Sequence, residues 1–331
     1  MRIPALSLFA CILCLSNCTK STNEIQVGSF ERIDAELDNI IKGTPKIEVI
    51  AEGFDWSEGP LWVGHLNMLL FTDVPRNTVY KWTEENGAEV YLTPSGFTGT
   101  ETTSREPGAN GLTFDDEGNL ILCQHGDRRL ALMNAPLDSP GPEYVTIADN
   151  FNGSRFNSPN DLVFRNYSFY FTDPPYGLGG QADDPEKEIP FQGVYRVNQD
   201  GLVSLLVDSL TRPNGIAFMP DGRLIIANSD PTKARWYEYQ LNDSTVTEGR
   251  VFYDATSLVG TVKGLPDGLK IDSKGYIYAT GPGGVLIFNS SGKLIGKISL
   301  NEAAANCALS DDEKTLYITN DMYILRVKLR D

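Results

Sequence analysis

The sequence is poor in the residues that act through nitrogen or sulfur. It has two histidines and five cysteines in 331 residues. Three cysteines fall within the first 18 residues, so only Cys123 and Cys307 remain for a folded domain. Two cysteines so far apart do not make the disulfide framework of a small secreted protein. We expect two buried free thiols, with a single bridge as the alternative.

Basic residues are also scarce. Lys and Arg number 28 against 44 Asp and Glu, which gives a net charge of −16. No cluster of Lys and Arg is interleaved with aromatic residues, so the chain has no patch that would attract a phosphate backbone. We therefore expect no nucleic-acid partner.

The apolar run at the start of the chain is too short for a transmembrane helix. It extends from Ile3 to Leu15 after Arg2, which predicts an export signal over residues 1–17. The run ends in Leu-Ser-Asn-Cys, which resembles a bacterial lipobox and predicts a lipidated Cys18. We expect a lipoprotein of the periplasm or outer membrane that meets the membrane only through this anchor. Ordinary secretion is the alternative.

Turn-forming residues are plentiful, with 31 Gly and 19 Pro in a chain that is 41% hydrophobic. This composition favours a β-rich globular protein with many tight turns. Residues 19–44 differ from the rest. A polar tether is expected first, and then one short amphipathic helix, because apolar residues recur there at spacings of three and four, at Phe30, Ile33, Leu37 and Ile40.

The remaining chain repeats one unit six times. Each copy has a polar residue, a short alternating strand, a turn, a second apolar strand and usually a third. The copies read SEGPLWVGHLNMLLFTD (57–73), ANGLTFDDEGNLILCQHGDRRL (109–130), PNDLVFRNYSFYFTDPPYG (159–177), PNGIAFMPDGRLIIANSD (213–230), PDGLKIDSKGYIYATGPGG (266–284) and NCALSDDEKTLYITND (306–321).

The polar residues that open the copies, which we call the anchors, are Glu58, Asn110, Asn160, Asn214, Asp267 and Asn306, spaced by 52, 50, 54, 53 and 39 residues. A period near 50 with about four strands predicts an all-β fold, a six-bladed β-propeller over residues 45–331. A β-sandwich is the alternative, but it would not repeat a polar residue at the same phase. Residues 45–54 are placed to supply the outer strand of the last blade and so close the ring.

In a propeller the innermost strands surround a central channel, so the anchors are expected to converge on its axis. Six oxygen-bearing side chains without His or Cys suit a hard cation such as Ca²⁺, which takes six to eight oxygens. Glu58 and Asp267 would balance a divalent charge, while anchors that do not touch the metal, Asn110 among them, would hold water or substrate. The alternative is that these residues only begin strands, since Pro-Asn and Asn-Gly pairs form turns.

Six motifs together resemble the gluconolactonase/regucalcin (senescence marker protein) family over roughly residues 45–330: SEGP, ANGL, SPND, FTDPPYG, RPNGIAF and LPDGLKID. The resemblance implies a six-bladed propeller that hydrolyses sugar lactones with the help of a divalent metal. Ca²⁺ is the metal we expect, with Zn²⁺ or Mg²⁺ as alternatives. It implies Glu58, Asn214 and Asp267 as metal ligands, Asp267 also as the catalytic acid/base, and Asn160 as a metal or substrate contact. Arg155 would correspond to a substrate-contacting arginine, at a longer spacing from Asn160 than in the animal members.

Three further residues are candidate substrate contacts. His125 follows the second strand of the second copy, where it is either a structural residue or a group at the channel mouth. Asp173 and Tyr176 end a strand in FTDPPYG, where they could meet substrate hydroxyls or cap a turn. The loop over residues 178–190 is expected to be exposed and able to cover the channel.

The predicted chemistry is hydrolysis of a lactone. A metal would stabilise the charge that grows on the carbonyl oxygen, and either Asp267 or a metal-bound hydroxide would begin the reaction. A related metal-dependent esterase or phosphotriesterase is one alternative, and a propeller that binds carbohydrate or protein without catalysis is another.

Overall fold

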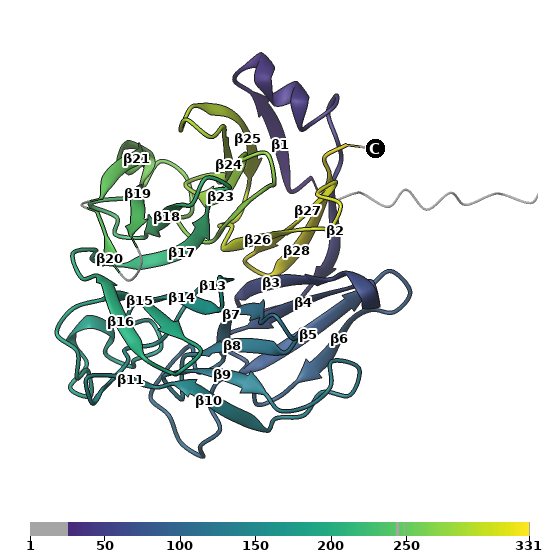
Figure 1. The fold of residues 1–331 in the computed structure, drawn as a ribbon. Helices are drawn as coiled ribbons and strands as arrows, with labels where there is room; N and C mark the ends of the chain where they lie inside the picture. The colour runs from purple at the N-terminus through teal and green to yellow at the C-terminus, as the bar shows by residue number, and fades with distance from the viewer. Residues whose placement is uncertain (1–25, 243–244, 248, 331) are drawn as a thin grey trace, which may run out of the picture.

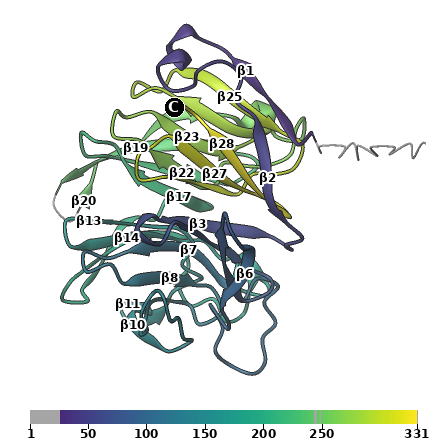
Figure 2. The same cartoon turned by 90° about the vertical axis from the view of Figure 1, so that its right-hand side faces the viewer.

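The computed structural model describes residues 26–330 apart from 243, 244 and 248. Figure 1 shows sheets of antiparallel strands arranged around a common axis, and Figure 2 shows them from the side. Six of the sheets have four or five strands each, and the chain passes from the innermost strand outward in each one. The predicted six-bladed β-propeller is therefore confirmed.

In each of the first three blades the four strands follow one another from the axis outward in chain order. Blade one has β3 (Ser57–Val63), β4 (Met68–Asp73), β5 (Thr78–Thr83) and β6 (Gly87–Leu92); blade two has β7 (Ala109–Phe114), β8 (Leu120–Gln124), β9 (Arg129–Met133) and β10 (Tyr144–Ala148); blade three has β13 (Leu162–Arg165), β14 (Ser168–Asp173), β15 (Gly193–Asn198) and β16 (Val203–Val207). A small hairpin, β11 (Asn150–Phe151) with β12 (Ser154–Arg155), joins blades two and three.

The last three blades carry extra or borrowed strands. Blade four has β17 (Pro213–Phe218), β18 (Arg223–Asn228), β19 (Arg235–Asn242), β20 (Thr245–Val246) and β21 (Arg250–Asp254); blade five has β22 (Leu269–Ile271), β23 (Ile277–Gly281), β24 (Gly284–Phe288), β25 (Leu294–Leu300) and β1 (Gly28–Arg32); blade six has β26 (Asn306–Leu309), β27 (Thr315–Asn320), β28 (Tyr323–Lys328) and β2 (Ile47–Glu52). The described residues also include four 3₁₀ helices: η1 (Ala35–Asn39), η2 (Gly64–Leu66), η3 (Gln181–Asp183) and η4 (Thr256–Leu258).

The ring closes through β2, as the sequence predicts. This strand pairs antiparallel with β28, so an N-terminal strand completes the C-terminal blade. Between the same two ends of the ring, Trp62 of blade one stacks on Tyr317 of blade six, with ring centroids 5.1 Å apart. Closure covers sheet edges that would otherwise be open to other chains.

The predicted helix at residues 30–40 is wrong. Residues Gly28–Arg32 instead form β1, which pairs with β25 and extends blade five, and only Ala35–Asn39 turn as a short 3₁₀ helix. Leu37 and Ile40 are buried against blades five and six, whereas Ile33 is 50% exposed. Because the spacing of apolar residues over so short a stretch fits two packed elements as well as one helix, it did not distinguish them.

The hydrophobic core is divided among the contacts between neighbouring blades. Six clusters of buried side chains each combine residues from two adjacent blades, and the sixth joins Phe71 of blade one to Tyr317 and Ile324 of blade six. Strand faces of this kind bury their apolar side chains by packing sheet against sheet. The inner ends of the strands, which carry the anchors, are thus held by apolar packing on both sides.

Cys123 and Cys307 are buried free thiols in blades two and six. The prediction of two free thiols is therefore confirmed, and the alternative of a disulfide bridge between them is wrong.

Within the described part of the chain, no helix has the length and apolar character needed to cross a membrane. The predicted signal peptide and Cys18 lie outside the described residues.

Candidate active site

The anchors stand at the start of the innermost strand of each blade, and neighbouring anchors touch. A Cβ added to Gly59, the residue after Glu58, would lie 2.0 Å from the carbonyl oxygen of Asn110. One added to Gly215, after Asn214, would lie 2.2 Å from the carbonyl oxygen of Asp267. Glycine is needed at both places because the backbones of adjacent blades approach too closely for any side chain. This contact brings the anchors into a ring.

Five of the six anchors line one axial pocket of about 400 Å³. They are Glu58, Asn110, Asn160, Asn214 and Asp267, and the predicted contact Tyr176 joins them. The sixth anchor, Asn306, does not line the pocket. Its Oδ1 accepts hydrogen bonds from Lys270 Nζ at 3.2 Å and from the Cys307 N–H at 2.9 Å, so it is engaged within the protein.

Three side-chain oxygens at this pocket are buried without a hydrogen-bond partner. They are Oδ1 of Asn110, Asn160 and Asp267. A buried acceptor without a partner costs about 1–3 kcal/mol, so three at one place indicate that something else satisfies them. The described residues hold no group of three or more His, Cys, Asp and Glu that could bind a metal. A cation here would therefore depend on the amide oxygens as well as the carboxylates.

The charge of the pocket favours a cation. Burial, with a smaller contribution from the nearby Asp161 carboxylate, raises the pKa of Glu58 to about 8. Burial also raises the pKa of Asp267, and Glu58 adds to the effect. Partial burial raises the pKa of Glu106 to about 7. Glu58 and Asp267 resist ionisation because little water reaches them and acidic groups lie close by, and a bound divalent cation would relieve this repulsion.

Four polar or aromatic residues of the pocket were not predicted from the sequence: Trp56, Glu106, Arg212 and Ser229. Two of them had a signal, since Trp56 and Arg212 each stand two residues before an anchor. Arg212 lies over the ring of Tyr176, 5.9 Å from its centroid. Glu106 comes from the loop between blades one and two, which carries no repeat motif, so nothing in the repeat predicts it.

Asp173 does not line the axial pocket. It is fully buried, and its two carboxylate oxygens accept hydrogen bonds from the N–H groups of Asn157 at 2.8 Å and Ser158 at 2.7 Å. Asp73 holds the corresponding segment of blade one through the N–H groups of Asp55 and Trp56. These contacts match the capping alternative, in which Asp173 fixes the loop that leads to Asn160.

His125 lies behind the pocket rather than at its mouth. It is fully buried, and its Nε2 is 3.5 Å from Asn160 Nδ2. Its Nδ1 is 3.9 Å from Glu106 Oε2. Burial lowers the pKa of His125 to about 4, so the ring is neutral near pH 7. The contact with Asn160 matches the structural alternative, while Nδ1 is buried without a hydrogen-bond partner.

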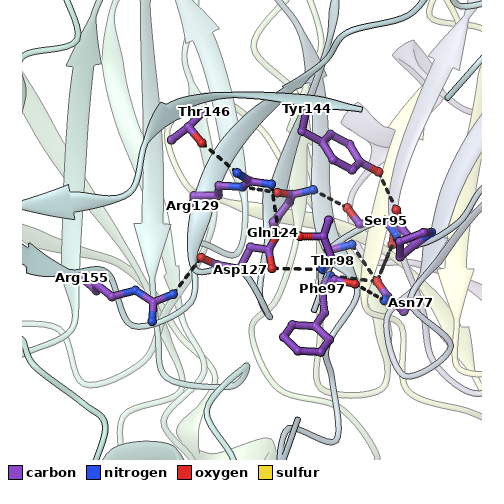
Figure 3. Close-up of polar contacts among 12 residues, drawn as sticks. Asn77, Ser95, Phe97, Thr98, Gln124, Asp127, Arg129, Tyr144, Thr146 and Arg155 are labelled. Atoms are coloured by element: carbon purple, nitrogen blue, oxygen red, sulfur yellow. Dashed lines mark hydrogen bonds and ion pairs between the residues drawn. The ribbon is translucent and has the colours of Figure 1, made fainter. Parts of the chain in front are cut away.

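Arg155 is exposed on β12 and lines a second cavity instead of the axial pocket. Its Nη2 donates to the carbonyl oxygen of Asp127 at 3.1 Å (Figure 3). The loop over residues 178–190 is also absent from the axial lining, and it is anchored by the buried side chains of Leu178 and Ile189. The loop is largely exposed, as expected, but its cavity-lining residues face the second cavity rather than the axial pocket, so the structure does not place it as a cover of the channel.

These features define the class of protein: a six-bladed propeller with an oxygen-rich, acidic pocket on its axis. The chain belongs to the SMP-30/gluconolactonase/LRE-like family, whose model matches residues 56–321. The family predicted from the repeat motifs is confirmed, and the protein is a member of the gluconolactonase-like lactonases.

Two relatives of known name are similar over most of the chain. The gluconolactonase of Zymomonas mobilis subsp. mobilis is 36% identical over 317 residues, which cover 93% of this chain and 88% of the relative. The pentonolactonase of Haloferax volcanii is 25% identical over 267 residues, which cover 79% of this chain and 80% of the relative.

Solved structures show the same fold. A gluconolactonase from Xanthomonas campestris has a TM-score of 0.78 at 26% identity, covering 92% of this chain and 96% of that one. Regucalcin from Agrobacterium tumefaciens, a calcium-binding protein, has a TM-score of 0.66 at 17% identity, covering 86% and 96%. The second likeness supports the fold alone.

Proposed function

We propose that the protein hydrolyses a sugar lactone in the axial pocket, with a divalent cation held by Glu58, Asn160, Asn214 and Asp267. The observation that carries this proposal is the set of buried, unpartnered oxygens, of which Asn160 and Asp267 each supply one. Oxygen donors alone suit Ca²⁺ best, with Mg²⁺ and Zn²⁺ as alternatives.

Hydrolysis of a lactone requires a proton to leave the attacking water and reach the ring oxygen. Water adds to the carbonyl carbon, and the bond from that carbon to the ring oxygen breaks. Asp267 is the proposed group that takes the proton and returns it, because its Oδ1 lies buried at the pocket without a partner. When bound, the cation supplies positive charge near the lactone carbonyl oxygen. Trp56, Val259 and Leu265 give the pocket an apolar wall that limits access of water.

The substrate class follows from the family and from the lining. The two named relatives are a gluconolactonase and a pentonolactonase. In this chain Asn110 and Arg212 line the pocket beside the proposed ligands and can bind the hydroxyl groups of a sugar ring. Tyr176 and Glu106 add two more polar groups. An aldonolactone fits these donors and acceptors better than an unsubstituted lactone does.

The experiment compares purified protein with and without a chelator on three substrates: glucono-1,5-lactone, an aryl ester and an aryl phosphotriester. The spontaneous opening of the lactone is subtracted in each assay. Turnover of the lactone that is lost with chelator and restored by Ca²⁺ supports the proposal. Turnover confined to the aryl ester or phosphotriester would favour the related esterase, and no turnover of any substrate would favour a binding propeller.

We also propose that the protein is exported and anchored through a lipid on Cys18. The support is the sequence of residues 1–18 alone, namely Arg2, the apolar run and the lipobox-like end. Incorporation of labelled palmitate into the expressed chain, and its loss in Cys18→Ser, would support the anchor. Equal labelling of both chains, or none of either, would contradict it.

A further inference from the structure

A second cavity of about 700 Å³ lies between the loops of blades two and three, beside the axial pocket. Phe97, Ser104 and Asp127 line it from the blade-two side, and Arg155, Gly177 and Glu186 from the blade-three side. The two sides are in contact, because a Cβ added to Gly179 would lie 2.6 Å from Thr103 Oγ1. The cavity is thus formed by loops that pack together.

The wall between the two cavities is thin. Tyr176 lines the axial pocket and the next residue, Gly177, lines the second cavity. Likewise Glu106 lines the axial pocket and Ser104 the second cavity. A Cβ added to Gly177 would lie 2.7 Å from the Cβ of His125, which itself contacts Asn160. A ligand long enough to pass this wall would meet both sites.

The lining selects a neutral, hydroxyl-rich ligand. Acidic side chains outnumber arginines, five to three, so an anion such as phosphate is disfavoured. Five hydroxyl side chains line the cavity and the apolar lining is small, so a lipid chain is disfavoured as well: the hydroxyls belong to Thr98, Thr102, Thr103, Ser104 and Thr146. Donors and acceptors of both kinds are present, as the hydroxyl groups of a sugar require.

The polar groups of this cavity are held in place. The Asp127 carboxylate accepts hydrogen bonds from Thr98 N at 3.1 Å and Thr98 Oγ1 at 2.8 Å, and Arg129 Nη2 lies 2.9 Å from it. Figure 3 shows Arg155 reaching the Asp127 carbonyl on one side and Thr98 meeting its carboxylate on the other. Among the described residues, that contact is the single hydrogen bond of the Arg155 guanidinium, so its other N–H groups are available. The half-buried ring of Phe97 adds an aromatic surface.

We propose that this second cavity is a subsite for a neutral glycosyl group carried by the lactone, so that the preferred substrates are glycosylated aldonolactones. The proposal rests on the proposed function of the axial pocket and extends it. The lactone ring occupies the axial pocket, and the attached sugar extends past the wall between the two cavities to reach Arg155, Thr98 and Phe97. Binding energy from the attached sugar then contributes to the reaction at the lactone.

The test measures kcat/KM for glucono-1,5-lactone and for its 4-O-glucosyl derivative with wild type, Arg155→Ala and Phe97→Leu. We expect wild type to prefer the glucosylated lactone at least about tenfold, and each variant to lower the ratio of the two values about tenfold. Arg250→Ala is the matched control, since Arg250 is an exposed arginine on blade four, and it should leave the ratio unchanged.

The outcomes separate this inference from the proposed function. Hydrolysis of glucono-1,5-lactone with no preference for the glucosylated form, and a ratio insensitive to both variants, overturns the subsite and leaves the lactonase intact. No hydrolysis of either lactone overturns the proposed function. In that case calorimetry measures whether the second cavity binds free cellobiose. Binding that is lost in Arg155→Ala would make the cavity a site for free sugar and would overturn its role as a substrate subsite.

Discussion

Ser229 fixes the orientation of the Asn214 amide. The Ser229 hydroxyl donates its proton to the carbonyl oxygen of Pro266, so its oxygen can only accept from Asn214 Nδ2, which lies 3.2 Å away. The opposite end of the amide, Oδ1, is then left for a ligand. A residue outside the set of anchors thus decides which atom of an anchor is offered to the proposed cation.

Ser229→Ala should therefore weaken metal binding without removing any ligand. Once the hydroxyl is lost, the amide can turn and present its NH₂ group, which repels a cation. We expect the Ca²⁺ concentration for half-maximal activity to rise about tenfold, which is about 1.4 kcal/mol, with kcat at saturating Ca²⁺ changed less than about twofold. Ser229→Thr, which keeps the hydroxyl, should restore most of the affinity. Unchanged Ca²⁺ dependence in Ser229→Ala would show that the amide is held by other contacts.

Asp267→Ala should abolish turnover while leaving the fold intact. The residue supplies a buried, unpartnered oxygen to the pocket, and loss of a general base lowers the rate by about 10²–10⁴-fold. Asn306→Ala is the matched change at another anchor, and its effect should stay below about tenfold because Asn306 Oδ1 is already bound to Lys270 and Cys307. Steady-state rates, with circular dichroism as the check on folding, measure both. Comparable losses in the two variants would contradict the assignment of roles.

The repeat explains why so much of the site could be predicted. The same polar residue recurs at one phase of a period of about 50, and the fold converts equal phase into a shared position around the axis. Glu58, Asn110, Asn160, Asn214 and Asp267 were found in this way. The phase does not say which anchor is satisfied internally, so Asn306 could not be told apart from the other five.

The residues that escaped prediction belong to the connections between blades. Glu106 lies in the loop between blades one and two, which does not share the repeat motif, and its position depends on how that loop packs. Arg155 lies beside the axis because it belongs to the β11–β12 hairpin between blades two and three. The loop at 178–190 lies there because buried Leu178 and Ile189 hold it against the blades. Loop packing follows from tertiary contacts that a periodic pattern does not contain.

Asp173 gives the protein a pH-dependent term in its stability. Burial raises the pKa of Asp173, and the two hydrogen bonds that its carboxylate accepts from N–H groups lower it. The effect of burial is the larger, so the pKa rises from its ordinary 3.8 to about 7. The folded protein then holds a proton that the unfolded chain releases between about pH 4 and pH 7, so this contribution is complete at low pH and is lost as pH rises through 7.

Asp173→Asn lacks this titration, and its destabilisation relative to wild type should therefore shrink as pH rises from 5 to 8. Over this range the difference of unfolding free energies should change by about 1–3 kcal/mol, the upper figure corresponding to the two pH units between 5 and the raised pKa at about 1.4 kcal/mol each. Urea unfolding at several pH values measures it. A difference between the two proteins that stays constant over this range would show that Asp173 remains ionised in the fold.

The segment before the propeller should contribute to its stability through Leu37. This side chain is 3% exposed in the core shared by blades five and six, where a Cβ added to Gly296 would lie 2.7 Å from its Cδ1 atom. Leu37→Ala leaves a cavity and should lower the free energy of unfolding by about 2–5 kcal/mol. Ile33→Ala is the matched control, because Ile33 is 50% exposed and its truncation should cost less than about 1 kcal/mol. Equal effects of the two changes, measured by urea unfolding, would mean that β1 and η1 detach from the blades before the core unfolds.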